Sequence, residues 1–425
     1  MREMKDSGIE WIGDIPTSWT TNKGKYLFQQ RSTKGNHIEL QLLSPTQKFG
    51  VIPQSMFEEL TTNTAVKINE KTDLMTFKTI HRGDYCISLR SFQGGFEYSL
   101  YEGVVSPAYT VFFKKGVLCN GYYKYLFKDQ SFIKEMNSYT LSLRDGKNIS
   151  FDDFGNTYLP IPPLAEQETI TDYLDSKCAE IDSLISDIQS QIEALEEYKR
   201  SVITEAVTKG LDPDVEMKDS GVQWIGKMPK HWTVDNPKWH FVQRKDRATK
   251  GLTQLTASQK YGVVTQEEYM EITGAKVVTV EKDFDILKLV CPGDFIIHMR
   301  SFQGGLEYSE KYGSISSAYV MLIPQKTILE PRFYKWFFKS PVYIDALSST
   351  SNLIRDGQAM RYANFIQLPI PLLPKEEQQQ IADYLDMKCA EIDNIIIEKK
   401  QQIDTIEEYK KSLIFEYVMG KKEVL

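Results

Sequence analysis

The chain has 425 residues, of which 41% are hydrophobic, 12% aromatic and 26% charged. At about 150 residues per domain this length predicts two to three domains, and the composition excludes a disordered tail or a collagen-like fibre. The five cysteines are scattered without a Cys-x-x-Cys pair, and no stretch approaches the ~20 apolar residues of a membrane helix. We therefore expect no disulfide framework, no structural zinc, no signal peptide and no membrane contact, and a cytoplasmic location.

Charge is divided unevenly along the chain, whose formal net charge is -7. Residues 1–150 carry +4 and residues 211–366 carry +2, whereas residues 151–210 carry -9 and residues 367–425 carry -4. Because mildly basic blocks alternate with acidic ones, the overall acidity does not exclude a polyanionic partner for the basic blocks.

The chain is a tandem duplication. Residues Met4–Trp19 (MKDSGIEWIGDIPTSW) recur as Met217–Trp232 (MKDSGVQWIGKMPKHW), with ten of sixteen positions identical. A repeat of this length predicts two copies of one structural plan. The content of Trp, Ile, Gly and Pro in this motif favours a packed connector that locks each globular block to the nearby end of the long helices. Further strings recur at nearly the same offset: QKFGV and QKYGV, GDYCISLRSFQGGFEYS and GDFIIHMRSFQGGLEYS, LPIP, and YLDSKCAEID and YLDMKCAEID.

Each copy begins with a globular block. Short β-rich runs such as residues 108–113 and 318–323, punctuated by Gly and Pro, predict a mixed α+β domain. Clusters of proline at residues 160–163 and 369–374 then end the block and precede a helix. The predicted segments are a first globular domain over 1–158, a helix over 159–210, a second globular domain over 211–367 and a helix over 368–425.

Each predicted helix carries a heptad seam. Apolar or small residues recur at steps of three and four, and Lys399 and Lys410 interrupt the second seam. About 40 residues at ~1.5 Å each make a rod of ~60 Å, too long for one globular block to cover, so the two seams are expected to bury each other. The seam leaves the direction open, but the connection through a globular block favours an antiparallel coiled coil over two independent amphipathic helices. The seam positions are Ile170, Leu174, Cys178, Ile181, Ile185, Ile188, Ile192, Leu195 and Val202, then Ile381, Leu385, Cys389, Ile392, Ile396, Ile403, Ile406 and Leu413.

No familiar catalytic motif is present. The sequence has no Gly-rich phosphate loop, no GxGxxG, no HExxH, no GxSxG, and no Asn/Asp-Pro-Pro-aromatic tetrapeptide of the amino-methyltransferase kind. The five histidines do not match between the copies and lack ligand spacing. We therefore expect neither an active site nor a metal site in this chain.

The duplicated Arg-Ser-Phe-Gln-Gly-Gly is the strongest signal outside the seams. Its glycines allow close backbone approach to a phosphate or a groove, Arg can pair with guanine, and Gln can pair with adenine. The alternative is a tight turn with Phe92 or Phe302 in the core and its Arg tied to Glu97 or Glu307. Matched polar loops add a Lys and a second Arg that could hold the phosphate backbone, or simply be solvated. The candidate DNA-binding residues are Arg90, Ser91, Gln93, Gly94, Gly95, Lys48 and Arg144, then Arg300, Ser301, Gln303, Gly304, Gly305, Lys260 and Arg355.

With these motifs the chain resembles a specificity subunit of a type I restriction–modification system over essentially its whole length. The resemblance rests on the WIG-type block, the RSFQGG segment, the LPIPP and LPIPLLPKEEQ turns, and the YLDxKCAEID helix in both halves. It implies two target-recognition domains, each reading half of a split DNA sequence, joined by an antiparallel coiled coil.

The resemblance also implies partners. The chain would have no catalysis and no cofactor of its own, and two modification subunits carrying S-adenosylmethionine would methylate adenine. Restriction subunits, the motor and nuclease, would join them. The two halves here are more alike than is usual in such pairs, so we expect inverted half-sites that are related but differ, because residues 55–80 and 266–290 have diverged. A stand-alone DNA-binding regulator and a structural coiled-coil adaptor are the alternatives.

Overall fold

The computed structural model divides the chain into two compact units. Unit 1 comprises Met1–Ile188 with Gln401–Leu425, and unit 2 comprises Gln189–Lys400. Each unit therefore contains one globular block and part of both long helices, a grouping that differs from the four segments read from the sequence. The structure describes residues 2–35, 40–61, 74–88, 95–139, 149–277, 286–325, 327–350 and 360–424.

The globular block of unit 1 is built on a four-stranded antiparallel sheet in the order β4-β11-β8-β9. Aromatic side chains from all four strands are buried on one face of it, with Phe28, Tyr85, Phe96 and Phe112 each no more than 2% exposed. The sheet strands are β4 (Phe28–Gln30), β8 (Tyr85–Ile87), β9 (Phe96–Tyr98) and β11 (Thr110–Lys114). This is the α+β block that the β-rich run at 108–113 predicts.

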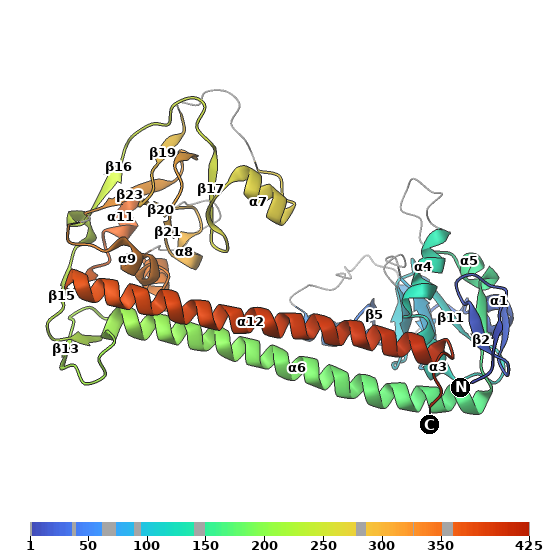
Figure 1. The fold of residues 1–425 in the computed structure, drawn as a ribbon. Helices are drawn as coiled ribbons and strands as arrows, with labels where there is room; N and C mark the ends of the chain where they lie inside the picture. Colours follow the sequence, from blue (N-terminus) through green and yellow to red (C-terminus); the bar gives the residue numbers. More distant parts are fainter. Residues whose placement is uncertain are drawn as a thin grey trace. The chain divides into compact units, whose positions relative to one another are not determined.

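Two-stranded ribbons and short helices surround this sheet (Figure 1). The ribbons pair β1 (Met4–Asp6) with β2 (Asp14–Pro16), β3 (Thr20–Lys23) with β12 (Tyr158–Ile161), β5 (Leu43–Thr46) with β6 (Gly50–Pro53), and β7 (Lys78–Ile80) with β10 (Gly103–Val105). The helices are α1 (Gly24–Leu27), α2 (Gln54–Leu60), the 3-10 turn η1 (Leu74–Thr76), α3 (Asn120–Leu126), α4 (Gln130–Ser138) and α5 (Phe151–Asn156).

Unit 2 repeats the plan. Its four-stranded sheet has the order β16-β23-β20-β21, with β16 (Phe241–Arg244), β20 (Phe295–Ile297), β21 (Glu307–Tyr308) and β23 (Val320–Pro324). Its ribbons pair β13 (Met217–Asp219) with β14 (Lys227–Pro229), β15 (Thr233–Asp235) with β24 (Ile370–Leu372), β17 (Leu255–Ser258) with β18 (Gly262–Thr265), and β19 (Lys288–Val290) with β22 (Gly313–Ile315). Its short helices are η3 (Pro237–Trp239), α7 (Gln266–Thr273), α8 (Ser301–Gly304), α9 (Pro331–Phe337), α10 (Pro341–Ser349) and α11 (Tyr362–Phe365).

The two long helices are α6 (Leu164–Lys209) and α12 (Lys375–Val418). They pack against each other in antiparallel fashion within each unit. In unit 1 the Nζ of Lys410 lies 2.6 Å from a carboxylate oxygen of Asp182. In unit 2 the Nζ of Lys399 donates to the side-chain oxygen of Gln191 at 2.6 Å. The two lysines that interrupt the heptad seam therefore reach across to polar groups of the opposite helix.

Most of the predicted seam positions are buried. Along the middle of the helices Ile188, Ile192, Ile392 and Ile396 are 2–7% exposed, whereas Ile185, Leu195, Ile403 and Ile406 are only partly buried. Among the residues that the structure describes, no helix combines the length and the apolar composition needed to cross a membrane.

The duplicated Trp motif packs at the ends of the long helices, as the connector interpretation expects. The fully buried indole of Trp19 donates its N–H to Glu166 at 2.9 Å, and that of Trp232 donates to Glu377 at 3.0 Å. Both acceptors lie in the first turn of a long helix. Each globular block is thereby fixed to the start of the helix that follows it in the chain.

Candidate nucleic-acid interface

In unit 2 the hairpin β17–β18 presents Lys260 at its tip. The tip spans residues 259–261, and Gly262, with a φ of +67°, returns the chain to β18. The side chain of Lys260 is exposed, and its Nζ lies 5.2 Å from the centre of the Tyr261 ring. The ammonium group therefore sits at the surface on an aromatic support, where it can contact an anion.

The RSFQGG segment of unit 2 forms a short helical turn that divides its side chains between interior and surface. Ser301 is fully buried, and its hydroxyl oxygen accepts the backbone N–H of His298 at 2.9 Å. Phe302 packs against the main core of the unit. Arg300 and Gln303 are exposed. The turn thus uses Ser and Phe for its own structure and leaves the Arg and the Gln available to a ligand.

Gly305 has a structural reason to lack a side chain. Its φ is +74°, and a Cβ built on it would lie 1.9 Å from the carbonyl oxygen of Phe338. A Cβ on Gly304 would lie 2.6 Å from the side chain of Gln259. The glycine pair therefore allows the turn to press against α9 on one side and against the hairpin tip on the other.

Gln259 joins the hairpin tip to the turn. Its side-chain Nε2 donates a hydrogen bond to the backbone carbonyl of Arg300 at 3.1 Å. Lys260 and Arg300, which are forty positions apart, are thereby brought to one surface. We call Gln259, Lys260, Arg300 and Gln303 the tip–turn surface. Gln259 was missing from the sequence-predicted residues, although the matched strings QKFGV and QKYGV were the signal that could have found it.

A buried carboxylate lies beneath the tip–turn surface. Glu307 is 2% exposed and pairs with Lys339, whose Nζ also donates to the carbonyl of Gly304 at 2.9 Å. The Nε2 of His298 lies 3.5 Å from the same carboxylate. The alternative prediction for RSFQGG, a tight turn, pairs this carboxylate with Arg300. Its partner in the structure is Lys339, and Arg300 stays at the surface.

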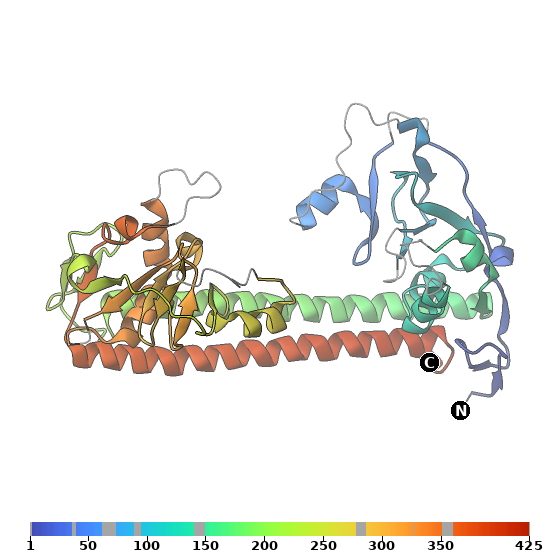
Figure 2. The same ribbon diagram turned by 90° about the horizontal axis from the view of Figure 1, so that it is seen from above.

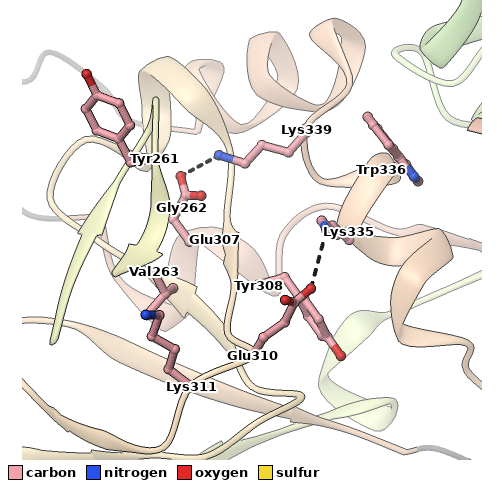
Figure 3. Close-up of a pocket in the computed structure, with 10 residues that line it drawn as sticks. All are labelled: Tyr261, Gly262, Val263, Glu307, Tyr308, Glu310, Lys311, Lys335, Trp336 and Lys339. Atoms are coloured by element: carbon pink, nitrogen blue, oxygen red, sulfur yellow. Dashed lines mark hydrogen bonds and ion pairs between the residues drawn. The ribbon is translucent and has the colours of Figure 1, made fainter. Parts of the chain in front are cut away.

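A cavity of about 330 Å³ opens beside this cluster (Figure 3). Figure 3 shows Lys339 pointing to Glu307, and Lys335 to Glu310 at 3.7 Å. The cavity combines ammonium groups with aromatic rings, but each of these lysines faces a carboxylate, so it carries little surplus positive charge. Its lining residues are Tyr261, Gly262, Val263, Glu307, Tyr308, Glu310, Lys311, Lys335, Trp336 and Lys339.

Unit 1 has the corresponding hairpin. Lys48 is exposed at the tip of β5–β6, with its Nζ 5.2 Å from the centre of the Phe49 ring. Glu97 is 1% exposed and pairs with Lys128 at 2.7 Å. Burial raises the pKa of Glu97 to about 7, and Lys128 opposes part of that rise. Both units therefore contain a buried, Lys-paired carboxylate two positions after RSFQGG in the sequence.

Of the remaining candidates in the first copy, only Gly95 lies among the described residues. Gly95 is buried, and its carbonyl accepts the backbone N–H of Ser88 at 2.8 Å. The sequence-predicted residues that lie outside the described residues are Arg90, Ser91, Gln93, Gly94, Arg144 and Arg355.

An arginine–aspartate pair braces each four-stranded sheet. Arg31 makes two hydrogen bonds to Asp84, at 2.7 and 3.0 Å, and Arg244 makes two to Asp294, at 2.7 and 2.8 Å. The carboxylate hydrogen bond raises the pKa of Arg244 above its ordinary value, so this residue is a permanent cation. These matched arginines bind within the protein and are not part of the tip–turn surface. Among the described residues, no group of three or more His, Cys, Asp and Glu side chains is placed to hold a metal ion.

Comparison with known proteins finds a family model that matches most of the first copy. Residues 15–194 match the family model of the type I restriction modification DNA specificity domain. That match contains the whole RSFQGG segment of the first copy and most of the first helix, and the second copy repeats both. Over these residues the chain is similar to the DNA specificity domain of type I restriction–modification systems.

Two proteins named as specificity subunits match a longer part of the chain. The chain is 25% identical over 272 residues to the putative type I restriction enzyme MjaX specificity subunit of Methanocaldococcus jannaschii, a match that covers 63% of this chain and 59% of that protein. It is 26% identical over 312 residues to the MjaVIII specificity subunit of the same organism, covering 69% of each.

One solved structure shares the fold along nearly the whole chain. It comes from work on complex assembly and conformational transition of the type I R-M system, and it has a TM-score of 0.67 at 12% identity. The match covers 96% of this chain and 99% of the other. At this identity the likeness establishes the fold alone.

Proposed function

We propose that this chain is the DNA sequence-specificity subunit of a type I restriction–modification complex, in which each globular block reads one half of a bipartite target. The observation that carries this proposal is the tip–turn surface, where Gln259 links an exposed Lys to an exposed Arg. Lys at the tip suits a phosphate contact, and Arg or Gln in the turn suits hydrogen bonds to base edges in the major groove.

The duplication supports a bipartite target. Unit 1 carries its own Lys-tipped hairpin, and unit 2 carries a second. Two readers on one chain recognise two half-sites, and the long helices between them set the length of unread DNA. Since the two copies differ in sequence between their matched motifs, the two half-sites differ as well.

The proposed complex supplies the chemistry that this chain lacks. Two modification subunits dock on the specificity subunit and methylate adenine with S-adenosylmethionine, which they bind themselves. Restriction subunits, the motor and nuclease, join the complex in the cytoplasm. This chain binds double-stranded DNA and needs no cofactor for that role.

Co-expression tests the proposal. The chain is produced with its neighbouring modification subunit in a host free of adenine methylation, and genomic methyladenine is mapped by sequencing. We expect one split motif, methylated on both strands and lost when the chain is omitted. A stable complex with intact cofactor binding in the partner but no methylation would overturn the proposal in favour of a regulator or an adaptor.

Charge reversal tests the tip–turn surface itself. We expect Arg300→Glu to lower DNA affinity and to relax the methylated motif in one half only, because unit 1 is unchanged. Lys260→Glu should weaken binding to all sequences and reduce its salt dependence. Lys238→Glu, an exposed change at η3, is the control and should leave the motif intact. An adaptor would be indifferent to all three.

A further inference from the structure

One short helix in each unit buries no side chain. α2 follows the hairpin β5–β6 in unit 1, α7 follows the hairpin β17–β18 in unit 2, and neither helix contains a buried residue. Figure 1 has α7 at the edge of unit 2, and Figure 2 has α2, the blue helix, at the edge of unit 1. Isolated helices of seven or eight residues are unstable in water, so neighbouring contacts must hold them in place.

Both copies have this helix, but the side-chain contact that holds it differs between the two copies. In unit 2 Glu268 pairs with Lys311 at 2.6 Å. Glu268 also closes a capping box, in which its carboxylate accepts the backbone N–H of Thr265 at 2.8 Å. At the corresponding positions of unit 1 the hydroxyl of Tyr101 lies 3.6 Å from the sulfur of Met56. An ion pair in one copy and a weak O–H to sulfur contact in the other thus maintain the same arrangement.

Both helices present apolar side chains to solvent at matched positions. Leu60 is 47% exposed and Ile272, its counterpart, is 55% exposed. Met56 lies four residues before Leu60, on the same face of α2, and is 37% exposed. A helix kept in two diverged copies without a core role, and with apolar groups on its surface, is typical of an interaction site.

Charge indicates what that partner is. Besides Glu268, which pairs with Lys311, α7 contains Glu267 and Glu271, and α2 contains Glu58 and Glu59. Neither helix contains Lys or Arg. DNA phosphates would be repelled by this face, whereas a protein surface rich in Lys and Arg would be attracted to it.

We propose that α2 and α7 are matched docking faces for a basic, partly apolar surface of the modification subunit, one subunit at each face. This inference rests on the proposed function and names a contact within it. The matched exposure of Leu60 and Ile272 supplies the apolar centre, and the glutamates supply the polar rim that selects a basic partner.

The test measures assembly without DNA. The full chain carrying Glu271→Lys and Ile272→Ser in α7 is titrated with purified modification subunit, and affinity and stoichiometry are followed by calorimetry and by mass measurement. We expect one of the two subunits to bind at least about tenfold more weakly, with the other unaffected. Adding Glu59→Lys and Leu60→Ser in α2 should weaken both. The control is Asp345→Lys, an exposed charge reversal on α10, which should change neither site.

Three outcomes would overturn the inference. Unchanged assembly with a weaker or altered DNA target would make the helices DNA readers. A drop in the melting temperature of the free chain would mean that the face is covered by the chain itself. Unchanged assembly and unchanged DNA binding would leave the helices without a partner. A wild-type chain that fails to bind the modification subunit at all would count instead against the proposed function, so the two failures are distinguishable.

Discussion

The side chain of Gln259 donates a hydrogen bond to the backbone carbonyl of Arg300, with 3.1 Å between Nε2 and the oxygen. This bond ties a hairpin tip to the turn that carries the candidate reading arginine. It fixes the spacing between two exposed cations whose positions in the sequence are far apart.

Removing that bond should weaken sequence discrimination at one half-site. Gln259→Ala loses one neutral hydrogen bond, which is worth about 1 kcal/mol or about a fivefold change in affinity. We expect discrimination to fall by that factor at the half-site read by unit 2, as measured by competition between target and single-mismatch duplexes. Gln367→Ala, an exposed change elsewhere in unit 2, should have no effect. Equal loss at both half-sites would contradict the assignment.

Gly305 should tolerate no side chain. A Cβ there meets the carbonyl oxygen of Phe338 at 1.9 Å, and the φ of +74° is unfavourable for alanine. We expect Gly305→Ala to lower the free energy of unfolding by at least about 3 kcal/mol. Gly251→Ala is the comparison, because it shares a positive φ, of +92°, but has no atom within 4 Å, so about 1 kcal/mol is expected. Urea denaturation of both variants measures the difference, and equal losses would argue against the backbone clash.

The two buried tryptophans should matter for stability in a way that an exposed one does not. Trp232→Phe keeps an aromatic ring, but it removes the N–H that binds Glu377 and leaves a small cavity where the larger indole was buried. We expect a loss of about 1–3 kcal/mol in the free energy of unfolding, because the partly buried carboxylate loses a donor. Trp239, which is 61% exposed, gives the control variant Trp239→Phe. Thermal unfolding should separate the two, and a silent Trp232→Phe would refute the anchoring role.

Glu97 should make the stability of the protein depend on pH. Its folded pKa is about 7, whereas an unfolded Glu titrates near about 4.3. Between these values the folded state keeps a proton that the unfolded state releases. The free energy of unfolding therefore falls as pH rises through this window, by up to about 4 kcal/mol from this group.

The variant Glu97→Gln isolates that effect. It cannot titrate, so the difference in stability between wild type and variant should shift steadily in favour of the variant from pH 4.5 to pH 7.5, as followed by urea denaturation. Glu10→Gln, at an exposed position, should show no such trend. A constant difference between wild type and Glu97→Gln across the range would rule out the raised pKa.

Much of the architecture follows from pattern alone. The duplication, the heptad positions from Ile170 onward and the mixed blocks are properties of residue order, because a seam of apolar residues every three to four positions must be buried along a helix. The Trp motif was also interpreted correctly as a connector, since large apolar residues with Gly and Pro suit a packed turn. Lys399 and Lys410 were harder to interpret, because a seam lysine makes sense only once the opposite helix offers Gln191 or Asp182.

The sequence by itself determined that this protein has two copies of one block, each with a long acidic helix and without a familiar catalytic motif. Only the tertiary structure decided which members of RSFQGG face solvent. Ser301 and Gly305 are used inside the turn, and Arg300 is left at the surface because Lys339 already neutralises Glu307. The reason is that the sequence names a residue in the same way whether it is buried or exposed. Burial and the choice of ion-pair partner depend instead on which distant segments of the chain pack together.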